Sequence, residues 1–198
     1  MSVVAVVDMD LRLPDEAGEL PGEVEVLDCY ALATSDLDAY AGLIVPTMVD
    51  QEFLHRHRKL LRAYLDGCGV IAFSGQLHRP WLPGAGFFEP KRTRSFRDYQ
   101  VSIVADHPIF SGVEASDLTY RRGVAGFFAR GYHRPPPGAE ILVAFTSGEP
   151  VVYIDRVTTG GTLLVHSGND LLYLTGSSAS RVPRQLLAWI RETGGGPP

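Results

Sequence analysis

Short apolar runs, each ended by a polar residue, a glycine or a proline, recur along the first half of the chain. Four of them lie at Val3–Val7, Val24–Leu27, Gly42–Pro46 and Val70–Phe73. Such short runs, rich in valine and isoleucine, predict buried β-strands, whereas helices need longer apolar patterns.

One segment carries a helical pattern instead. Between Asp50 and Asp66 the apolar side chains recur at helical spacing. They form one stripe, which consists of Phe53, Leu54, His57, Leu60, Leu61, Tyr64 and Leu65. Asp50 is expected to cap this helix and Gly67 to end it. Because the strand from Val70 follows at once, a right-handed parallel crossover is the expected connection.

The second half of the chain has a different pattern. Prolines and glycines interrupt residues 77–97, which predicts a long loop, and residues 9–22 are expected to form a loop as well. Strands or extended segments are predicted at Tyr99–Val104, Gly123–Ala129, Ile141–Phe145, Val151–Ile154 and Thr162–Val165. The links at 147–150 and 158–161 are typical of hairpins. A final helix is expected over Arg181–Glu192, with Ser178 or Ser180 as its cap.

These elements predict an α/β fold of the flavodoxin-like kind: an open, mostly parallel sheet with helices on both faces and an antiparallel β extension in the second half. The parallel part should hold the strands near 3–7, 24–28, 42–46 and 70–74, joined by the strand near 162–166. A chain of 198 residues with 45% apolar content suits one domain with a sizeable core. We expect that domain to span residues 1–193 and residues 194–198 to form a flexible tail.

Charge and cysteine content narrow the classes of function. A formal net charge of -5 disfavours nucleic acid as a general partner. Cys29 and Cys68 lie outside any zinc-binding spacing and are expected to be buried free thiols, with a disulfide between them as the alternative. The first residues lack the basic start of a signal peptide, and no apolar run approaches the roughly 20 residues that span a bilayer. A cytoplasmic protein that does not cross a membrane is the expectation.

Two polar side chains end apolar runs and suggest chemistry. Ser74 follows Val70–Phe73, and His166 ends a later run within 161–168. In an open α/β sheet, the carboxyl ends of neighbouring strands meet in one crevice. If these strands are neighbours, Ser74 and His166 are candidate catalytic residues, as nucleophile and base. The alternatives are a turn serine that caps backbone groups and a hydrogen-bonded histidine at the sheet rim.

Three motifs carry a resemblance to a known family. They are the strand-helix-strand unit over 42–75, the turn Asp106–Gly112, and the strands over 149–156 and 160–168. Together they resemble the class I glutamine amidotransferase-like superfamily, and within it the trehalose-utilisation-type proteins and the related trimerisation domains of some β-galactosidases. The resemblance covers most of residues 40–170. It implies a flavodoxin-like fold and puts Ser74 and His166 where that family has its cysteine nucleophile and its histidine.

The catalytic triad of that family is incomplete here. A hydroxyl replaces the thiol, and a free serine is a far weaker nucleophile at neutral pH. Gly168 stands where the acid is expected, so Asp170 could orient the imidazole only if the turn brings it back. The loop 46–49, which would supply oxyanion donors, has no glycine, and Pro46 has no N–H.

These departures leave functions of different classes open. One is an amidotransferase-like domain without glutaminase activity that binds a small molecule or a protein partner at the carboxyl-end crevice of the sheet. The alternative is a hydrolase that uses Ser74 and His166 on an amide or carbohydrate-derived substrate. A third is a structural subunit with no ligand. No cofactor is indicated, and a homo-oligomer is expected because such domains often serve in larger assemblies.

The residues beside the crevice are the candidates for ligand binding. These are Thr47, Gln76, His78, Arg79 and Asn169. No metal is expected, because His55 and His57 would point about 200° apart on a helix. The basic run Lys91–Arg97 suggests an anionic ligand or partner, and the alternative is a solvated face. Further cations lie at Arg121, Arg122, Arg130, His133 and Arg134.

Overall fold

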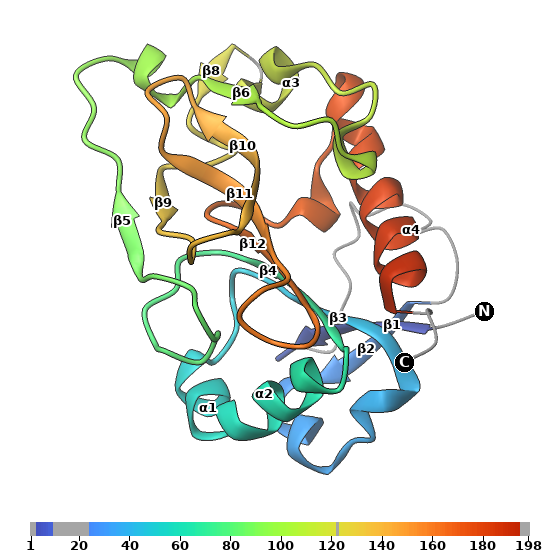
Figure 1. Ribbon diagram of the computed structural model, residues 1–198. Coiled ribbons are helices and arrows are strands. Elements are labelled where there is room, and N and C mark those ends of the chain that lie inside the picture. Colours follow the sequence, from blue (N-terminus) through green and yellow to red (C-terminus); the bar gives the residue numbers. More distant parts are fainter. Residues whose placement is uncertain (1–2, 10–23, 122, 195–198) are drawn as a thin grey trace.

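The computed structural model describes residues 3–9, 24–121 and 123–194, and a sheet of eight strands forms its centre (Figure 1). The strands lie side by side in the order β2-β1-β3-β4-β12-β11-β10-β6. The late strand β12 is therefore inserted next to β4, in the middle of the sheet.

One side of this sheet is parallel. It consists of β1 (Val3–Asp8), β2 (Val24–Asp28), β3 (Tyr40–Val45), β4 (Val70–Ser74) and β12 (Thr162–His166). The pairs β1–β2, β1–β3, β3–β4 and β4–β12 all run in the same direction. The predicted parallel set is confirmed, including the join through the strand near 162–166.

The other side of the sheet is antiparallel. It consists of β11 (Pro150–Asp155), β10 (Glu140–Phe145) and β6 (Val101–Ile103). Short hairpin links connect β10 to β11 and β11 to β12, and the pairs run in opposite directions. This confirms the predicted antiparallel extension.

Helices cover both faces of the sheet (Figure 1). The helices α1 (Gln51–Arg56) and α2 (Arg58–Asp66) pack their apolar side chains against one face, and α4 (Val182–Gly194) packs against the other. Two hydrophobic clusters result, one on each face, because successive strand residues point to opposite sides. Among the described residues, no helix combines the length and the apolar content that crossing a membrane requires.

The helix predicted over 50–66 is interrupted at one residue. Asp50 caps α1 through its side chain, which accepts from Glu52 and Phe53, and Gly67 ends α2 as expected. At His57 the chain leaves helical geometry for one residue, and the ring Nδ1 lies 3.0 Å from the Phe53 carbonyl oxygen. The same carbonyl also accepts from the His57 backbone N–H at 3.1 Å, so the ring and the main chain share one acceptor at the break.

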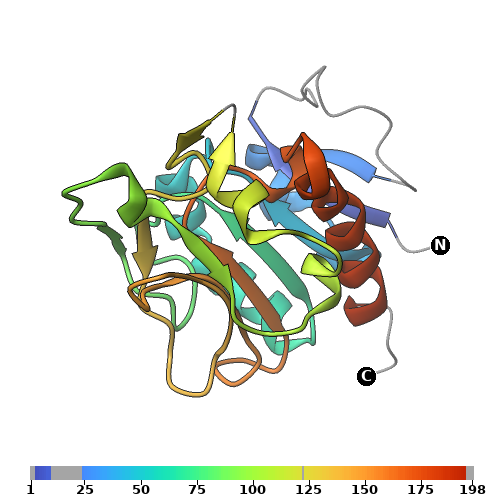
Figure 2. The ribbon, with the colours of Figure 1, turned by 90° about the horizontal axis from the view of Figure 1, so that it is seen from above.

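Short elements occur where a loop was expected. Within 77–97, the strand β5 (Phe88–Pro90) pairs with β9 (Gly131–His133), so the expectation of an uninterrupted loop is wrong. Strand β7 (Tyr120–Arg121) pairs with β8 (Val124–Ala125), and α3 (Ala115–Thr119) precedes them. Figure 2 shows β5 and β9 at the opposite end of the molecule from α4. Elements of two to five residues leave no periodic signal in a sequence.

The final helix begins close to its predicted start, but its expected cap is wrong. Ser178 and Ser180 lie in a tight turn, Ser177–Arg181, and their hydroxyls donate to Asp117 and to the Ser177 carbonyl. Most of the loop predicted over 9–22 and the tail predicted over 194–198 lie outside the described residues.

The two cysteines have different environments. Both are free thiols, and Cys29 is buried as expected. Burial raises the pKa of the Cys29 thiol to about 11. Cys68 is exposed, which corrects the expectation of a second buried thiol. It follows the end of α2 with a φ of 68°, and this turn directs the side chain out of the core.

Candidate functional site

The two candidate catalytic residues end neighbouring parallel strands. In the register of β4 and β12, Ser74 lies directly opposite His166. Both belong to the sheet face that α4 covers, since their strand neighbours Ala72 and Leu164 pack in that cluster. Neither side chain reaches the surface, because Ser74 is 6% exposed and His166 is 0% exposed.

The imidazole of His166 is enclosed by a loop side chain. The Phe128 ring lies 4.5 Å from it, centroid to centroid, and tilted by 36°. Neither ring nitrogen has a hydrogen-bond partner among the described residues. The main chain of Phe128 and Asn169 is close enough to favour protonation slightly, yet not at hydrogen-bonding geometry. Burial, aided by the charge of nearby His133, lowers the pKa of His166 to about 3.

The hydroxyl of Ser74 has a structural partner. The backbone N–H of Leu171 donates to Ser74 Oγ at 3.3 Å, so the side chain links β4 to the segment after β12. The space beside it holds about 10 Å³, roughly one water molecule. Because both nitrogens of His166 are unpartnered, no hydrogen bond joins the hydroxyl to its candidate base. A serine nucleophile requires that bond.

The expected oxyanion donors are already engaged. In nucleophile elbows, the residue after the serine supplies one N–H. Here the Gly75 N–H donates to the His166 carbonyl at 2.9 Å. The Thr47 N–H and hydroxyl donate to Asp170 Oδ1 at 2.6 and 2.8 Å. Asp170 therefore binds Thr47 and does not orient the imidazole.

The backbone around Ser74 also differs from an elbow. Ser74 lies in strand geometry, and the positive φ of 138° falls on Gly75 instead. After Gly75 the described chain continues as a loop towards β5, without the helix that follows a strained strand-to-helix turn. The N–H that reaches Ser74 Oγ comes instead from Leu171, the first residue of a single 3-10 turn after β12.

A segment that sequence reasoning did not single out closes this crevice. We call residues 126–131 the strap. Ala129 bridges to Gly168, Asn169 Nδ2 donates to the Phe127 carbonyl at 2.7 Å, and Ser167 Oγ donates to the Gly131 carbonyl at 2.8 Å. A Cβ on Gly168 would lie 1.7 Å from the Phe128 carbonyl oxygen. Glycine at 168, where the family resemblance implies an acid, thus permits the strap to lie against the end of β12.

An open cleft lies on the outer side of the strap. It consists of two pockets of about 640 and 260 Å³ that share Thr47, Phe127 and Asn169. Gln76 lines the smaller pocket, and Asp170 lines the larger one. Burial raises the pKa of the Asp170 carboxyl, against the opposing effect of the Thr47 hydrogen bonds. We call this region the carboxyl-edge cleft, and three of the predicted ligand-binding residues, Thr47, Gln76 and Asn169, lie in it.

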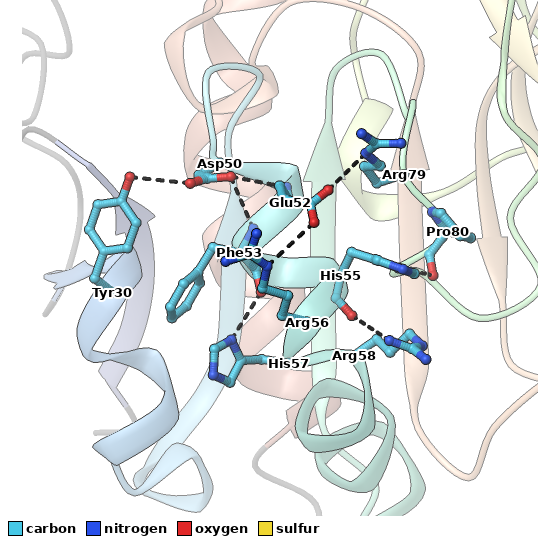
Figure 3. Close-up of polar contacts among 10 residues, drawn as sticks. All are labelled: Tyr30, Asp50, Glu52, Phe53, His55, Arg56, His57, Arg58, Arg79 and Pro80. Atoms are coloured by element: carbon cyan, nitrogen blue, oxygen red, sulfur yellow. Dashed lines mark hydrogen bonds and ion pairs between the residues drawn. The ribbon is translucent and has the colours of Figure 1, made fainter.

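The other two predicted ligand-binding residues bind the helix α1. Arg79 Nε pairs with Glu52 at 3.0 Å, as Figure 3 shows. The backbone N–H groups of His78 and Arg79 donate to the buried side chain of Gln51, whose Nε2 donates in turn to the Gln76 carbonyl at 2.8 Å. Gln51 was not singled out from the sequence, because a lone glutamine in a helix carries no signal.

The described residues hold no group of three or more His, Cys, Asp and Glu side chains that could bind a metal. The two helix histidines are used separately. His55 Nδ1 lies 3.2 Å from the Pro80 carbonyl oxygen, whereas His57 stacks on Phe53 with centroids 4.2 Å apart (Figure 3).

Comparison with known proteins supports the fold. No family model matches the sequence, and a search of curated proteins finds no match. The "mmIFT52 N-terminal domain" is similar at a TM-score of 0.57 and 11% identity, over 95% of this chain and 97% of that one. A glutamine amidotransferase from Thermotoga maritima is similar at a TM-score of 0.53 and 14% identity, over 96% and 83%. A β-galactosidase from Rahnella sp. R3 gives 0.49 and 16%, over 96% of this chain and 31% of the other. The similarity to the Thermotoga amidotransferase supports the α/β fold that was predicted.

Proposed function

We propose that this chain is an amidotransferase-like domain without glutaminase activity, which binds a small molecule in the carboxyl-edge cleft. The observation that carries the proposal is the contrast across the strap. On the inner side, Ser74 and His166 are buried and not joined by a hydrogen bond. On the outer side, a cleft stands open at the position where ligands bind in open α/β sheets.

The cleft has the properties of a small-molecule site. Its larger pocket, about 640 Å³, falls within the usual range of ligand pockets, roughly 300–1,000 Å³. The ring of Phe127 supplies an apolar wall, and the amides of Gln76 and Asn169 supply polar groups that could orient a ligand. One N–H of Asn169 Nδ2 donates to the Phe127 carbonyl, which leaves its second N–H to donate and its Oδ1 to accept. A protein partner that inserts one side chain here is the variant of the same proposal.

The motifs quoted above also lead us to propose kinship with the class I amidotransferase-like superfamily, in the branch of trehalose-utilisation-type proteins and β-galactosidase trimerisation domains. The similar amidotransferase fold supports this kinship at the level of architecture. The finer branch rests on the short motifs alone.

The binding proposal is tested by screening small polar compounds against the isotope-labelled protein by NMR. We expect saturable binders that shift the amide signals of Thr47, Gln76 and Asn169, and weaker binding to the Phe127→Ala variant. Thr93→Ala, an exposed change outside the cleft, serves as the matched control. Binders that shift other surfaces only, or that bind both variants equally, would contradict the proposal.

The alternative function is a hydrolase that uses Ser74 and His166, and the register that places them opposite each other favours it. That function requires the strap to move away from His166 and the segment at Leu171 to move away from Ser74, so that a substrate reaches both groups. A fluorophosphonate probe and a glutaminase assay test it directly. We expect no labelling and no ammonia release; labelling that Ser74→Ala abolishes would establish the hydrolase and overturn the non-catalytic proposal.

A further inference from the structure

The basic run Lys91–Arg97 divides into one structural cation and three free ones. Lys91 Nζ donates to Ser147 Oγ at 2.6 Å and pairs with Glu149 at 2.8 Å, and its side chain is only 5% exposed. It also lies 4.7 Å from the centroid of the Phe145 ring. Lys91 thus fastens the loop to the end of β10, and it is not available to a partner.

The arginines that follow have no such role. Arg92, Arg94 and Arg97 are exposed, and none of them forms an ion pair with a described residue. The same holds for Arg121 on β7. The acid among them is Asp98, whose Oδ2 accepts from the backbone N–H groups of Arg94 and Ser95 at 2.6 and 2.9 Å. These bonds lower the pKa of Asp98. Asp117, which lines the same pocket as Arg121, is bound by the N–H and hydroxyl of Ser178, so both carboxylates near the four guanidinium groups are engaged by neighbouring residues.

Two apolar side chains lie exposed among these cations. Phe96 is 61% exposed and has the Arg97 guanidinium 6.0 Å from its ring centroid. Val124 is 53% exposed and pairs across the β7–β8 hairpin with Arg121. The turn Phe96–Tyr99 packs against β8, and the Tyr99 ring lies against Gly126. The two segments therefore form one surface.

The local structure holds this surface in place before any partner arrives. Ser95 and Asp98 form a reciprocal capping box at the start of the turn Phe96–Tyr99. The Gln100 N–H closes the turn on the Arg97 carbonyl, and Gln100 Nε2 donates to the Tyr120 hydroxyl at 2.7 Å. A partner would pay little ordering entropy for the backbone here, which favours binding.

We propose that this arginine–phenylalanine face, formed by Arg92, Arg94, Phe96, Arg97, Arg121 and Val124, docks an acidic protein segment that carries apolar side chains. Arginine and aromatic side chains dominate the binding energy of protein interfaces. Four guanidinium groups gathered on a chain of net charge -5 are complementary to an acidic partner surface. An exposed valine offers nothing to stacked bases, and the cations cluster instead of following a groove, so a protein segment fits better than nucleic acid. This inference goes beyond the cleft: the face shares Arg121 with the larger pocket, and its other residues lie outside both pockets.

The test uses the whole chain and a fluorescent acidic peptide in which aspartate and glutamate alternate with leucine and phenylalanine. Fluorescence anisotropy measures the affinity, and NMR of the labelled protein locates the contact. We expect saturable binding with signal shifts in residues 92–97 and 121–124. The charge-reversed variant Arg92→Glu/Arg94→Glu/Arg97→Glu should weaken binding by at least about tenfold. The matched control is Arg56→Glu/Arg58→Glu/Arg184→Glu, which changes the charge equally on other exposed surfaces and should lose much less.

Phe96→Ala separates docking from simple charge attraction. It leaves every cation in place and should weaken the affinity for the peptide by about fivefold. Equal loss in the two charge-reversed variants, no effect of Phe96→Ala, or shifts outside the face would overturn the proposal. Tighter binding of single-stranded oligonucleotide than of peptide would overturn it in favour of a nucleic-acid site. A failure of the cleft in its own NMR screen leaves these readouts unaffected, because the two surfaces are probed by different ligands and variants.

Discussion

Two consecutive phenylalanines in the strap have opposite environments, and they mark the difference between the two sides of the carboxyl edge. Phe128 is 3% exposed and stacks on His166, whereas Phe127 is 40% exposed and lines both pockets of the cleft. Both residues lie in bends of the chain, and the Phe128 ring turns towards His166. The same segment therefore covers His166 on one side and forms a wall of the cleft on the other.

This comparison shows that a position at the end of a strand does not by itself make a residue catalytic. Ser74 and His166 meet at neighbouring strand ends, as the general rule for α/β sheets requires. The Ser74 hydroxyl nevertheless accepts a structural hydrogen bond, and the His166 nitrogens have no partner among the described residues. The N–H groups of Gly75 and Thr47 already donate to other acceptors. Access and free donors decide whether chemistry can follow, and these depend on the strap.

The largest effect is expected from truncating the buried member of the phenylalanine pair. Phe128→Ala removes the ring that covers His166 and should lower the free energy of unfolding by about 3–5 kcal/mol. Phe127→Ala, the matched control, should cost less than about 1 kcal/mol because its ring is partly in solvent. Urea unfolding of both variants measures the difference. Similar losses of unfolding free energy in the two variants would show that the two phenylalanine rings are not packed differently.

The next effect is acid sensitivity of the buried side. Burial lowers the pKa of His166 to about 3 and that of His133 to about 4. Below an ordinary histidine pKa near 6.5 the unfolded chain binds protons that the folded chain does not. The free energy of unfolding therefore decreases as the pH is lowered, until each folded pKa is reached. Each residue contributes a slope of about 1.4 kcal/mol per pH unit. Urea unfolding at pH 7 and pH 5.5 should show this slope, reduced in His166→Gln and unchanged in the exposed control His78→Gln.

A smaller effect on the free energy of unfolding is expected at Asp170, which lines both the space beside Ser74 and the larger pocket of the cleft. Asp170→Ala leaves the Thr47 N–H and hydroxyl without their acceptor and should cost about 1–3 kcal/mol. Asp170→Asn keeps an acceptor oxygen. Because burial raises the pKa of Asp170, its ionised form costs stability as pH rises through that pKa, and the amide removes this cost. At pH 7 the Asn variant should lie within about 1 kcal/mol of the parent or above it; an equal loss in both variants would contradict the role of Thr47.

The smallest stability effect is expected on the outer side of the strap. Gln76 is exposed and lines the smaller pocket, so Gln76→Ala should change the free energy of unfolding by less than about 0.5 kcal/mol. It should still lower the affinity for any compound found to bind the cleft. Calorimetric titration with such a compound, beside a thermal melt, separates the two quantities. A clear loss of stability with unchanged binding would show that Gln76 has a structural role and does not bind the ligand.

The main elements of the fold could be predicted because their signals are local. Apolar runs such as Val70–Phe73 and the helical stripe after Asp50 depend only on nearby residues. The break at His57, the pairing of β5 with β9 and the exposure of Cys68 depend on contacts or turns that a periodic pattern does not contain. The adjacency of Ser74 and His166 was predicted from topology, and it is present.

The sequence by itself determined the alternation of strands and helices, the residue types that end the strands and the glycine at position 168, because these follow from residue type and order. Only the tertiary structure decided that the strap covers His166, that Asp170 binds Thr47, and that Lys91 is used while its neighbouring arginines are free. The physical reason is that burial and hydrogen-bond partners arise between residues far apart in the chain. A serine or a histidine is the same residue in the sequence whether its side chain faces solvent or is buried in the core.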